Sequence, residues 1–304
     1  ILRCLVGSEM CIRDSSCTVR LNELMSGHTS FKIGGPADIL VLPESIEQLR
    51  EVLKVVKETV VPLTLLGNGS NVLVRDKGIR GIVIKLGNML RHFYEAEDLL
   101  VFGSGYSLAL ASYKAMECGK TGMEFAVGIP GSIGGAVYMN AGAYDGEMQN
   151  IVNCVKVMDL QGNERVLTAE ELNFGYRKTS LQNSGLIVTE VTLKMPSGNK
   201  DEIKSKMDDF SHRRISKQPL EMPSAGSMFK RPPGYFAGTL IDQAGLKGYT
   251  VGGAQISTKH AGFVVNVGGA TAADVLQLIK DVQTKIKAGV GVELQPEVLV
   301  IGEE

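Results

Sequence analysis

The sequence has 304 residues, which allows two or three domains at roughly 100–200 residues each. Hydrophobic residues make up 44% and charged residues 21%, values that exclude a disordered or collagen-like chain. With 32 lysines and arginines against 33 aspartates and glutamates, the net charge of −1 gives no basic surface for nucleic acid or an anionic membrane as the main partner.

Cysteine and histidine are few and scattered. The five cysteines form no CxxC pair, and the four histidines show no metal-binding spacing, so we expect reduced thiols, no metal and a cytoplasmic protein. No run approaches 18 apolar residues, so we expect no transmembrane helix. Residues 1–16 fit neither helical nor strand periodicity and are no signal peptide; we interpret them as a non-native N-terminal scar outside the fold.

The first two thirds of the chain alternate between helical and strand patterns. Apolar spacing over 44–59 predicts a helix, with Ser45 and Gln48 as a capping box. Turn residues Gln161, Gly162 and Asn163 predict a hairpin between two β-type runs. The further predicted elements are strands at 60–66, 81–86, 99–102, 151–160, 164–167 and 186–195, and a helix at 108–118.

The last third looks rich in helix and poor in strand, which predicts a separate smaller domain. An amphipathic helix carrying Ile203, Met207, Phe210 and Arg214 precedes a segment rich in Pro and Gly at 217–233, where we expect Ser227 in a turn. A second helix is predicted over 271–287, with Thr271 and Asp274 as its cap and Gly289 as its stop. Residues 293–301 are expected to form an edge strand that carries Glu297.

Two glycine-rich loops stand out, at 66–71 (LGNGSN) and 128–143 (GIPGSIGGAVYMNAGA). Neither matches the Rossmann or P-loop signature. Successive glycines still let several backbone N–H groups converge on an anion, which favours a phosphate-binding role through neutral amides. The alternative is that the loops are tight turns at domain corners.

Three polar side chains are candidates for chemistry. Judged from its spacing alone, Arg177 is either a surface cation or a functional one. Glu297 is either a carboxylate that faces outward from an edge strand or a buried functional carboxylate. Ser227 has no histidine close to it in the sequence, which argues against a hydrolase nucleophile. From composition and periodicity alone the chain is a nucleotide-binding α/β protein of two or three domains.

Six motifs, in order, resemble the UDP-N-acetylenolpyruvoylglucosamine reductase family in its shorter type. They are SFKIGGPAD (30–38), LGNGSNVLV (66–74), GIPGSIGGAVYMNAGAYDGE (128–147), FGYRKTS (174–180), PSAGSMFKRP (223–232) and QPEVLVIG (295–302). The resemblance implies an α+β fold: an FAD-binding fold of the vanillyl-alcohol-oxidase class in two subdomains, plus a smaller α/β substrate-binding domain. The implied boundaries are 17–85 with 294–304 returning to it, 86–200, and 201–293.

The resemblance also implies a reaction, the reduction of UDP-N-acetylglucosamine enolpyruvate to UDP-N-acetylmuramic acid in peptidoglycan precursor synthesis, with non-covalent FAD and with NADPH as hydride donor. Ser227 matches the family's proton donor, and Arg177 and Glu297 match its other catalytic residues. Lys217, Lys230 and Arg231 fall where the family contacts the UDP end; Arg231 stands where the longer type has Asn. The positions that fall on FAD contacts are Gly67, Asn68, Gly69, Ser70, Asn71, Ile129, Pro130, Gly131, Ser132, Gly134, Gly135, Ala136, Asn140, Gly142 and Ile187.

Two other functions remain open at this point. A flavin oxidase of the same fold would consume O2 without a UDP-sugar. A catalytically silent nucleotide-sugar-binding protein would be colourless and would not turn over NADPH. We expect a monomer.

Overall fold

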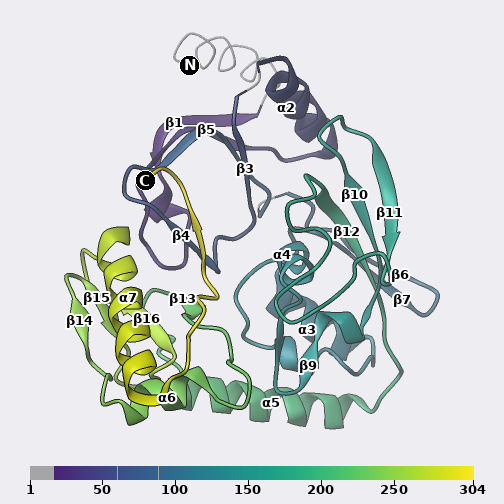
Figure 1. Cartoon of the computed structure of the whole chain (residues 1–304). Helices are drawn as coiled ribbons and strands as arrows, with labels where there is room; N and C mark the ends of the chain where they lie inside the picture. The colour runs from purple at the N-terminus through teal and green to yellow at the C-terminus, as the bar shows by residue number, and fades with distance from the viewer. Residues whose placement is uncertain (1–16, 60, 88) are drawn as a thin grey trace. The chain divides into compact units, whose positions relative to one another are not determined.

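The computed structural model describes residues 17–59, 61–87 and 89–304 (Figure 1), so the interpretation of residues 1–16 as a scar lies outside the described residues. The described chain divides into two compact units. Unit 1 comprises the residues up to Leu21, with Ile39–Asn68 and Gly81–Arg213. Unit 2 comprises Asn22–Asp38, Gly69–Arg80 and Arg214–Glu304.

Unit 1 is built around a five-stranded antiparallel sheet in the order β11-β10-β12-β7-β6. Its strands are β6 (Phe93–Ala96), β7 (Leu99–Gly103), β10 (Val152–Met158), β11 (Glu164–Thr168) and β12 (Ile187–Lys194). Helices α3 (Leu108–Glu117) and α4 (Ile133–Tyr138) bury Leu108 and Ile133 in one core with Phe102 and Val191 of the sheet. The predicted hairpin around Gly162 is confirmed as β10–β11.

Most of a four-stranded sheet also belongs to unit 1, in the order β1-β2-β5-β3. Its strands are β1 (Thr18–Leu24), β2 (Pro36–Leu42), β3 (Leu63–Leu66) and β5 (Ile79–Lys85), and β3 runs parallel to β5. Helix α2 (Ile46–Thr59) buries Leu49, Val52 and Leu53 against it. The side-chain oxygen of Ser45 accepts a bond from the Gln48 amide at 3.2 Å, which confirms one half of the predicted capping box. The Gln48 side chain accepts from the Glu44 amide at 2.7 Å instead of from the Ser45 amide.

Short elements complete unit 1 after β7. A two-stranded ladder joins β8 (Gly142–Ala143) to β9 (Gly146–Glu147). Single 3-10 turns are η2 (Glu124–Ala126) and η3 (Met148–Asn150). Helix α5 (Lys200–Lys217) buries Met207 and Phe210 as its spacing predicts, and the Phe210 ring stacks on Tyr144 with centroids 4.3 Å apart.

Unit 2 contains a four-stranded antiparallel sheet in the order β13-β16-β15-β14. Its strands are β13 (Ser224–Ser227), β14 (Thr250–Val251), β15 (Ala254–Ile256) and β16 (Phe263–Asn266). Helices α6 (Ala237–Gln243) and α7 (Ala272–Val290) bury one apolar stripe each with this sheet. The turn η1 (Met25–Gly27) and the parallel pair of β4 (Val72–Val74) with β17 (Leu299–Ile301) complete the unit.

Four expectations for the last third need correction. The region is not poor in strand, because it contains the whole β13–β16 sheet; its strands are two to four residues long, too short to show a period. Ser227 ends strand β13 instead of lying in a turn. Helix α7 passes Gly289 and ends at Val290, with Gly291 as its left-handed C-cap (φ 72°). The last strand is only Leu299–Ile301, which leaves Glu297 before it.

Candidate active site

The second glycine-rich loop and the start of the first, up to Asn68, belong to unit 1 and lie close together there. The first follows β3, as predicted, and a Cβ built on Gly67 would lie 3.2 Å from the hydroxyl oxygen of Ser132 in the second. Ser132 is the N-cap of α4, and its hydroxyl accepts a bond from the Gly135 amide at 3.3 Å. The second loop is therefore not loop throughout, since six of its residues form α4.

The backbone amides of the second loop divide into two groups. Those of Ile133 and Gly134 donate to the carbonyls of Tyr106 and Ser104, both at 2.9 Å, and so attach the loop to the turn after β7. Those of Gly131 and Ser132 donate to no acceptor among residues 17–59, 61–87 and 89–304. Only the amides of Gly131 and Ser132 are therefore available to an anion. The prediction that the successive amides of this loop converge on a phosphate applies to these two and not to the whole loop.

The first loop offers donors of the same kind. The amides of Asn68, Gly69 and Ser70 also find no acceptor in the part of the chain that the structure describes. Neutral backbone donors in glycine-rich turns form anion-binding concavities without any lysine or arginine. This arrangement suits a pyrophosphate in a chain with no excess of basic residues.

Ser104 is a candidate site residue that the sequence analysis missed. Its side chain is 4% exposed, and its hydroxyl has no hydrogen-bond partner among the described residues. It adjoins the second loop, because a Cβ on Gly134 would lie 2.7 Å from the Ser104 Cβ. A buried hydroxyl without a partner needs a reason, and a bound phosphate or ribose oxygen would supply one. The signal in the sequence was the GSG triplet at 103–105, between a strand and a helix.

Arg177 lies in unit 1 at the tip of a tight hairpin. Gly175 and Lys178 exchange backbone hydrogen bonds of 2.9 and 3.1 Å, and Arg177 between them has φ 55°, in the left-handed region. Its half-buried guanidinium donates to the carbonyls of Asn140 at 3.4 Å and Gly142 at 3.5 Å. A guanidinium carries a permanent positive charge and can form paired hydrogen bonds with a carboxylate.

Ser227 and Glu297 lie on neighbouring segments of unit 2. Ser227 is exposed and is paired with Phe263 across the sheet. The next residue, Met228, accepts a hydrogen bond at 2.8 Å from the Glu297 amide. Asn71, the last residue of the first loop, fixes the same segment: its side-chain amide donates to the Glu297 carbonyl at 3.3 Å. Unit 2 thus brings together two of the three predicted catalytic residues, whereas Arg177 belongs to unit 1.

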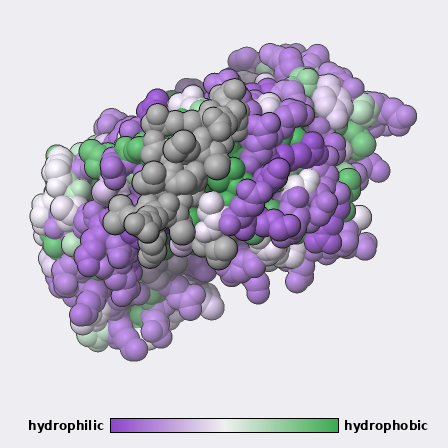
Figure 2. Space-filling model, turned by 90° about the horizontal axis from the view of Figure 1, so that it is seen from above, coloured by the Kyte–Doolittle hydropathy of each residue, from purple (hydrophilic) through white to green (hydrophobic). Residues whose placement is uncertain are grey.

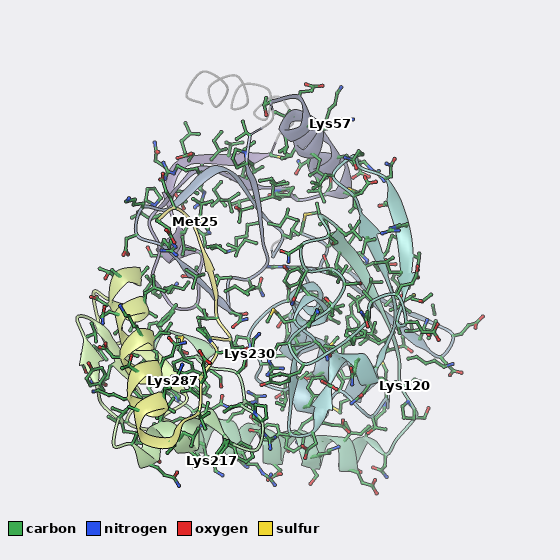
Figure 3. The ribbon with its side chains drawn as sticks, viewed as in Figure 1. Met25, Lys57, Lys120, Lys217, Lys230 and Lys287 are labelled. Carbon is green, nitrogen blue, oxygen red and sulfur yellow. The ribbon has the colours of Figure 1, made fainter. Side chains whose placement is uncertain are left out.

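The three cations expected at the UDP end all belong to unit 2. Lys217 is exposed at the last residue of α5, and Lys230 lies on the segment after β13 (Figure 3), where its amide donates to the Gln295 carbonyl at 2.8 Å. The Arg231 guanidinium carbon lies 4.0 Å from the centroid of the Phe236 ring. The backbone of Lys230 is therefore held beside the segment that carries Glu297.

The remaining predicted contact, Ile187, is a buried core residue at the start of β12, with 1% exposure. Hydrophilic residues cover most of what Figure 2 shows of the described chain. Within that described part, no helix is long and apolar enough to cross a membrane. No group of three His, Cys, Asp or Glu residues among 17–59, 61–87 and 89–304 is placed to hold a metal ion.

Comparisons with known proteins show which family this chain resembles. Residues 218–301 match the family model "UDP-N-acetylenolpyruvoylglucosamine reductase, C-terminal domain", and residues 37–168 match an FAD binding domain. Over 286 residues, the chain is 49% identical to the UDP-N-acetylenolpyruvoylglucosamine reductase of Clostridioides difficile and 51% identical to that of Clostridium perfringens. Each alignment covers 94% of both chains.

A solved structure extends the agreement to the fold. The crystal structure of the reductase of the same name from Thermus caldophilus superposes with a TM-score of 0.78, at 38% identity, over 93% of this chain and 98% of that one. Together with the FAD binding domain, this match confirms the expected fold class and the expected flavin, FAD.

Proposed function

The chain belongs to the UDP-N-acetylenolpyruvoylglucosamine reductase family of oxidoreductases, and from this premise we propose that it reduces UDP-N-acetylglucosamine enolpyruvate to UDP-N-acetylmuramic acid with NADPH as hydride donor. One observation carries the assignment of roles: unit 2 holds Ser227 and Glu297, from motifs 70 positions apart (297 minus 227), on segments joined by a backbone hydrogen bond. The proposed reaction needs a proton donor and a carboxylate of this kind.

FAD is the group that the two glycine-rich loops would hold. The amides of Asn68–Ser70, Gly131 and Ser132 are the candidates for its pyrophosphate, and the Ser104 hydroxyl is a candidate for a further polar contact. When bound, FAD supplies a carrier that accepts a hydride from NADPH and passes it on, which no amino-acid side chain can do.

The chain's own residues would handle charge and protons. Reduction of a C=C bond conjugated to a carboxylate places additional negative charge on that carboxylate, and the Arg177 guanidinium is the group proposed to stabilise it. The Ser227 hydroxyl then gives its proton to C2 of the substrate; serine is a weak acid, but a carbanion-like carbon is a strong base. Glu297 is proposed to order this arrangement through a hydrogen bond or a shared proton.

The UDP end would be held by charge. Lys217, Lys230 and Arg231 are proposed to contact the diphosphate, because phosphate oxygens accept strong charge-assisted hydrogen bonds from ammonium and guanidinium groups. This division leaves the neutral glycine-rich loops to FAD and the basic residues Lys217, Lys230 and Arg231 to the substrate. We further propose that the protein acts as a monomer, which size-exclusion chromatography with light scattering would test.

The function is tested with the purified protein in two measurements. The visible spectrum should show bound flavin, and NADPH should be consumed rapidly only when the UDP-enolpyruvyl sugar is added, with formation of UDP-N-acetylmuramic acid detected by mass spectrometry. Rapid O2 consumption without the UDP-sugar would support the oxidase alternative instead. A colourless protein without NADPH turnover would support a silent binding protein.

A further inference from the structure

The half-buried side chain of Gln182 joins the Arg177 hairpin to the end of α4. Its amide nitrogen donates to the carbonyl of Arg177 at 3.1 Å and to the carbonyl of Tyr138 at 3.2 Å. A primary amide has two N–H groups, so both bonds can form at once. Gln182 lies outside every motif that the sequence analysis identified.

Asn140 holds the same hairpin from its other end. It is 1% exposed, and its side-chain nitrogen donates to the Gly175 carbonyl and to the Glu147 carboxylate, both at 3.0 Å. Its side-chain oxygen accepts a bond from the Gln149 amide at 3.0 Å. The carboxamide is therefore fully engaged within the protein. We accordingly interpret Asn140 as acting on the hairpin, although its position falls on an expected flavin contact.

Arg177 needs support of this kind. Its φ of 55° is unfavourable for any residue with a Cβ, so the hairpin tends to relax when its restraints are removed. The side chain starts from this backbone, so the point from which the guanidinium extends depends on the conformation of the hairpin. That conformation is held by the hydrogen bonds of Asn140 and Gln182.

We propose that Gln182 is a positioning residue for Arg177: by binding the Arg177 and Tyr138 carbonyls, it keeps the guanidinium directed at the place where the substrate carboxylate gains charge. This inference rests on the role of Arg177 in the proposed function. It predicts that, of the two half-reactions, Gln182 affects only substrate reduction, and only while Arg177 is present. A structural role alone would act on stability and not depend on the arginine.

The test is a double-mutant cycle on the FAD-loaded enzyme, followed by stopped flow. Gln182→Met keeps the length of the side chain and removes both donors; we expect flavin reduction by NADPH to stay within about twofold, and re-oxidation by the enolpyruvyl sugar to slow about 10- to 100-fold. Arg177→Ala should slow re-oxidation at least as much. Adding Gln182→Met to Arg177→Ala should change the rate less than about twofold, because residues acting as a unit are not additive.

Two further variants serve as controls. Gln255→Met removes another half-buried glutamine amide, which donates to Thr250 at 2.9 Å in the β14–β15 hairpin; it should lower the Tm by a similar amount and leave both half-reactions unchanged. Gln182→Lys restores a donor for both carbonyls and should return re-oxidation to within about threefold of wild type.

The outcomes separate this inference from its premise. If Arg177→Ala re-oxidises at the wild-type rate, the proposed role of Arg177 fails. Suppose that Arg177→Ala re-oxidises slowly, and that the double variant is slower again by the factor that Gln182→Met causes in the wild-type enzyme. Gln182 then does not act through Arg177, and the inference is overturned. The inference would also be overturned if Gln182→Met and Gln255→Met re-oxidised at the same rate, or if Gln182→Lys re-oxidised as slowly as Gln182→Met.

Discussion

Ser227 is the residue for which the proposed mechanism makes its most specific prediction. As a proton donor to C2 it acts only after the hydride has reached the substrate. In Ser227→Ala we therefore expect flavin reduction by NADPH near the wild-type rate, and re-oxidation by the enolpyruvyl sugar slowed by 10²–10⁴, about 3–5 kcal/mol of barrier. Stopped-flow absorbance of the flavin measures both steps.

A purely structural Ser227 would behave differently. Its exposed hydroxyl at the end of β13 would then contribute at most about 1 kcal/mol to stability and little to either step. Ser227→Cys is the matched control, because a thiol also donates a proton and should recover part of the rate. Re-oxidation of Ser227→Ala within about threefold of wild type would reject the proton-donor role.

Glu124 is a buried carboxylate whose protonation state affects stability. It is 3% exposed and accepts bonds from the Thr121 hydroxyl at 2.6 Å and the Gly122 amide at 2.8 Å, with the Lys206 ammonium 3.9 Å away. Burial alone raises the pKa of Glu124, but these hydrogen bonds and the lysine outweigh it, so the net pKa lies below its ordinary value of 4.5. The folded state therefore prefers the ionised form.

The sign of the pH dependence follows from this lowered pKa. The stabilisation by ionised Glu124 is complete well above pH 4.5 and is lost as the pH falls below that value. Glu124→Gln should cost about 1–2 kcal/mol at pH 7, and the difference from wild type should shrink as the pH falls below about 4.5. Thermal melts of both proteins at pH 7, 5 and 3.5 would check this; a difference that stays constant with pH would contradict it.

At the scale of elements, the N-terminus of α7 depends on a residue almost 200 positions away. The Asp76 carboxylate accepts bonds from the amides of Ala272 at 2.7 Å and Ala273 at 2.9 Å, beside the local capping box of Thr271 and Asp274. A negative charge here satisfies two free donors and complements the helix dipole. Asp76→Ala should therefore cost about 1–2 kcal/mol in urea unfolding.

Asp98→Ala is the control for this helix-cap prediction. Asp98 is an aspartate that caps none of the described helices: its carboxylate lies 3.5 Å from the Lys120 ammonium, and its side chain is 92% exposed. Its loss should cost less than about 0.5 kcal/mol. Equal losses for Asp76→Ala and Asp98→Ala would show that Asp76 contributes only surface charge.

The same helix illustrates what the sequence can predict and what it cannot. Its local cap, Thr271 with Asp274, follows from spacing alone and is confirmed, but Asp76 is brought there by the fold. Long elements such as α2 and β12 have enough residues to show a period. Strands β14 and β15, with two and three residues, present too few positions, and they form because α7 and β16 offer them a surface and hydrogen bonds.

The candidate site is also predictable from the sequence only in part. Motifs identify Arg177, Ser227 and Glu297 as chemical groups, because the residue types are visible in the sequence. The groups that hold them are not visible: Asn140 reaches Gly175 across 35 positions, and Asn71 reaches Glu297 across 226. Ser104 was missed because its significance is an unpaired buried hydroxyl, a property of packing.

At the scale of the whole molecule, the three-domain division predicted from the sequence stays a prediction. The described chain forms two units. Gly69–Arg80 and the C-terminal strand, which the prediction assigns to the first FAD-binding subdomain, both belong to unit 2, whereas Ile39–Asn68 of the same predicted subdomain belongs to unit 1. In the proposed function, both glycine-rich loops still bind FAD. Stability of the molecule should then depend on flavin concentration.

FAD should be bound without a covalent link, because residues 128–143 contain no His or Cys to form one. Acid precipitation should therefore release the flavin to the supernatant, and flavin retained in the pellet would contradict this.

The pyrophosphate of FAD should contribute to its binding. Adding FAD back to apoprotein from which the flavin was removed under mild conditions should raise the Tm, with about 1.4 kcal/mol of added stability for each tenfold rise in free FAD above its Kd. Riboflavin has the same ring system without the pyrophosphate. If the free amides of Asn68–Ser70, Gly131 and Ser132 bind the pyrophosphate, riboflavin at equal concentration should stabilise far less than FAD. Equal stabilisation by the two flavins would show that these amides hold no phosphate.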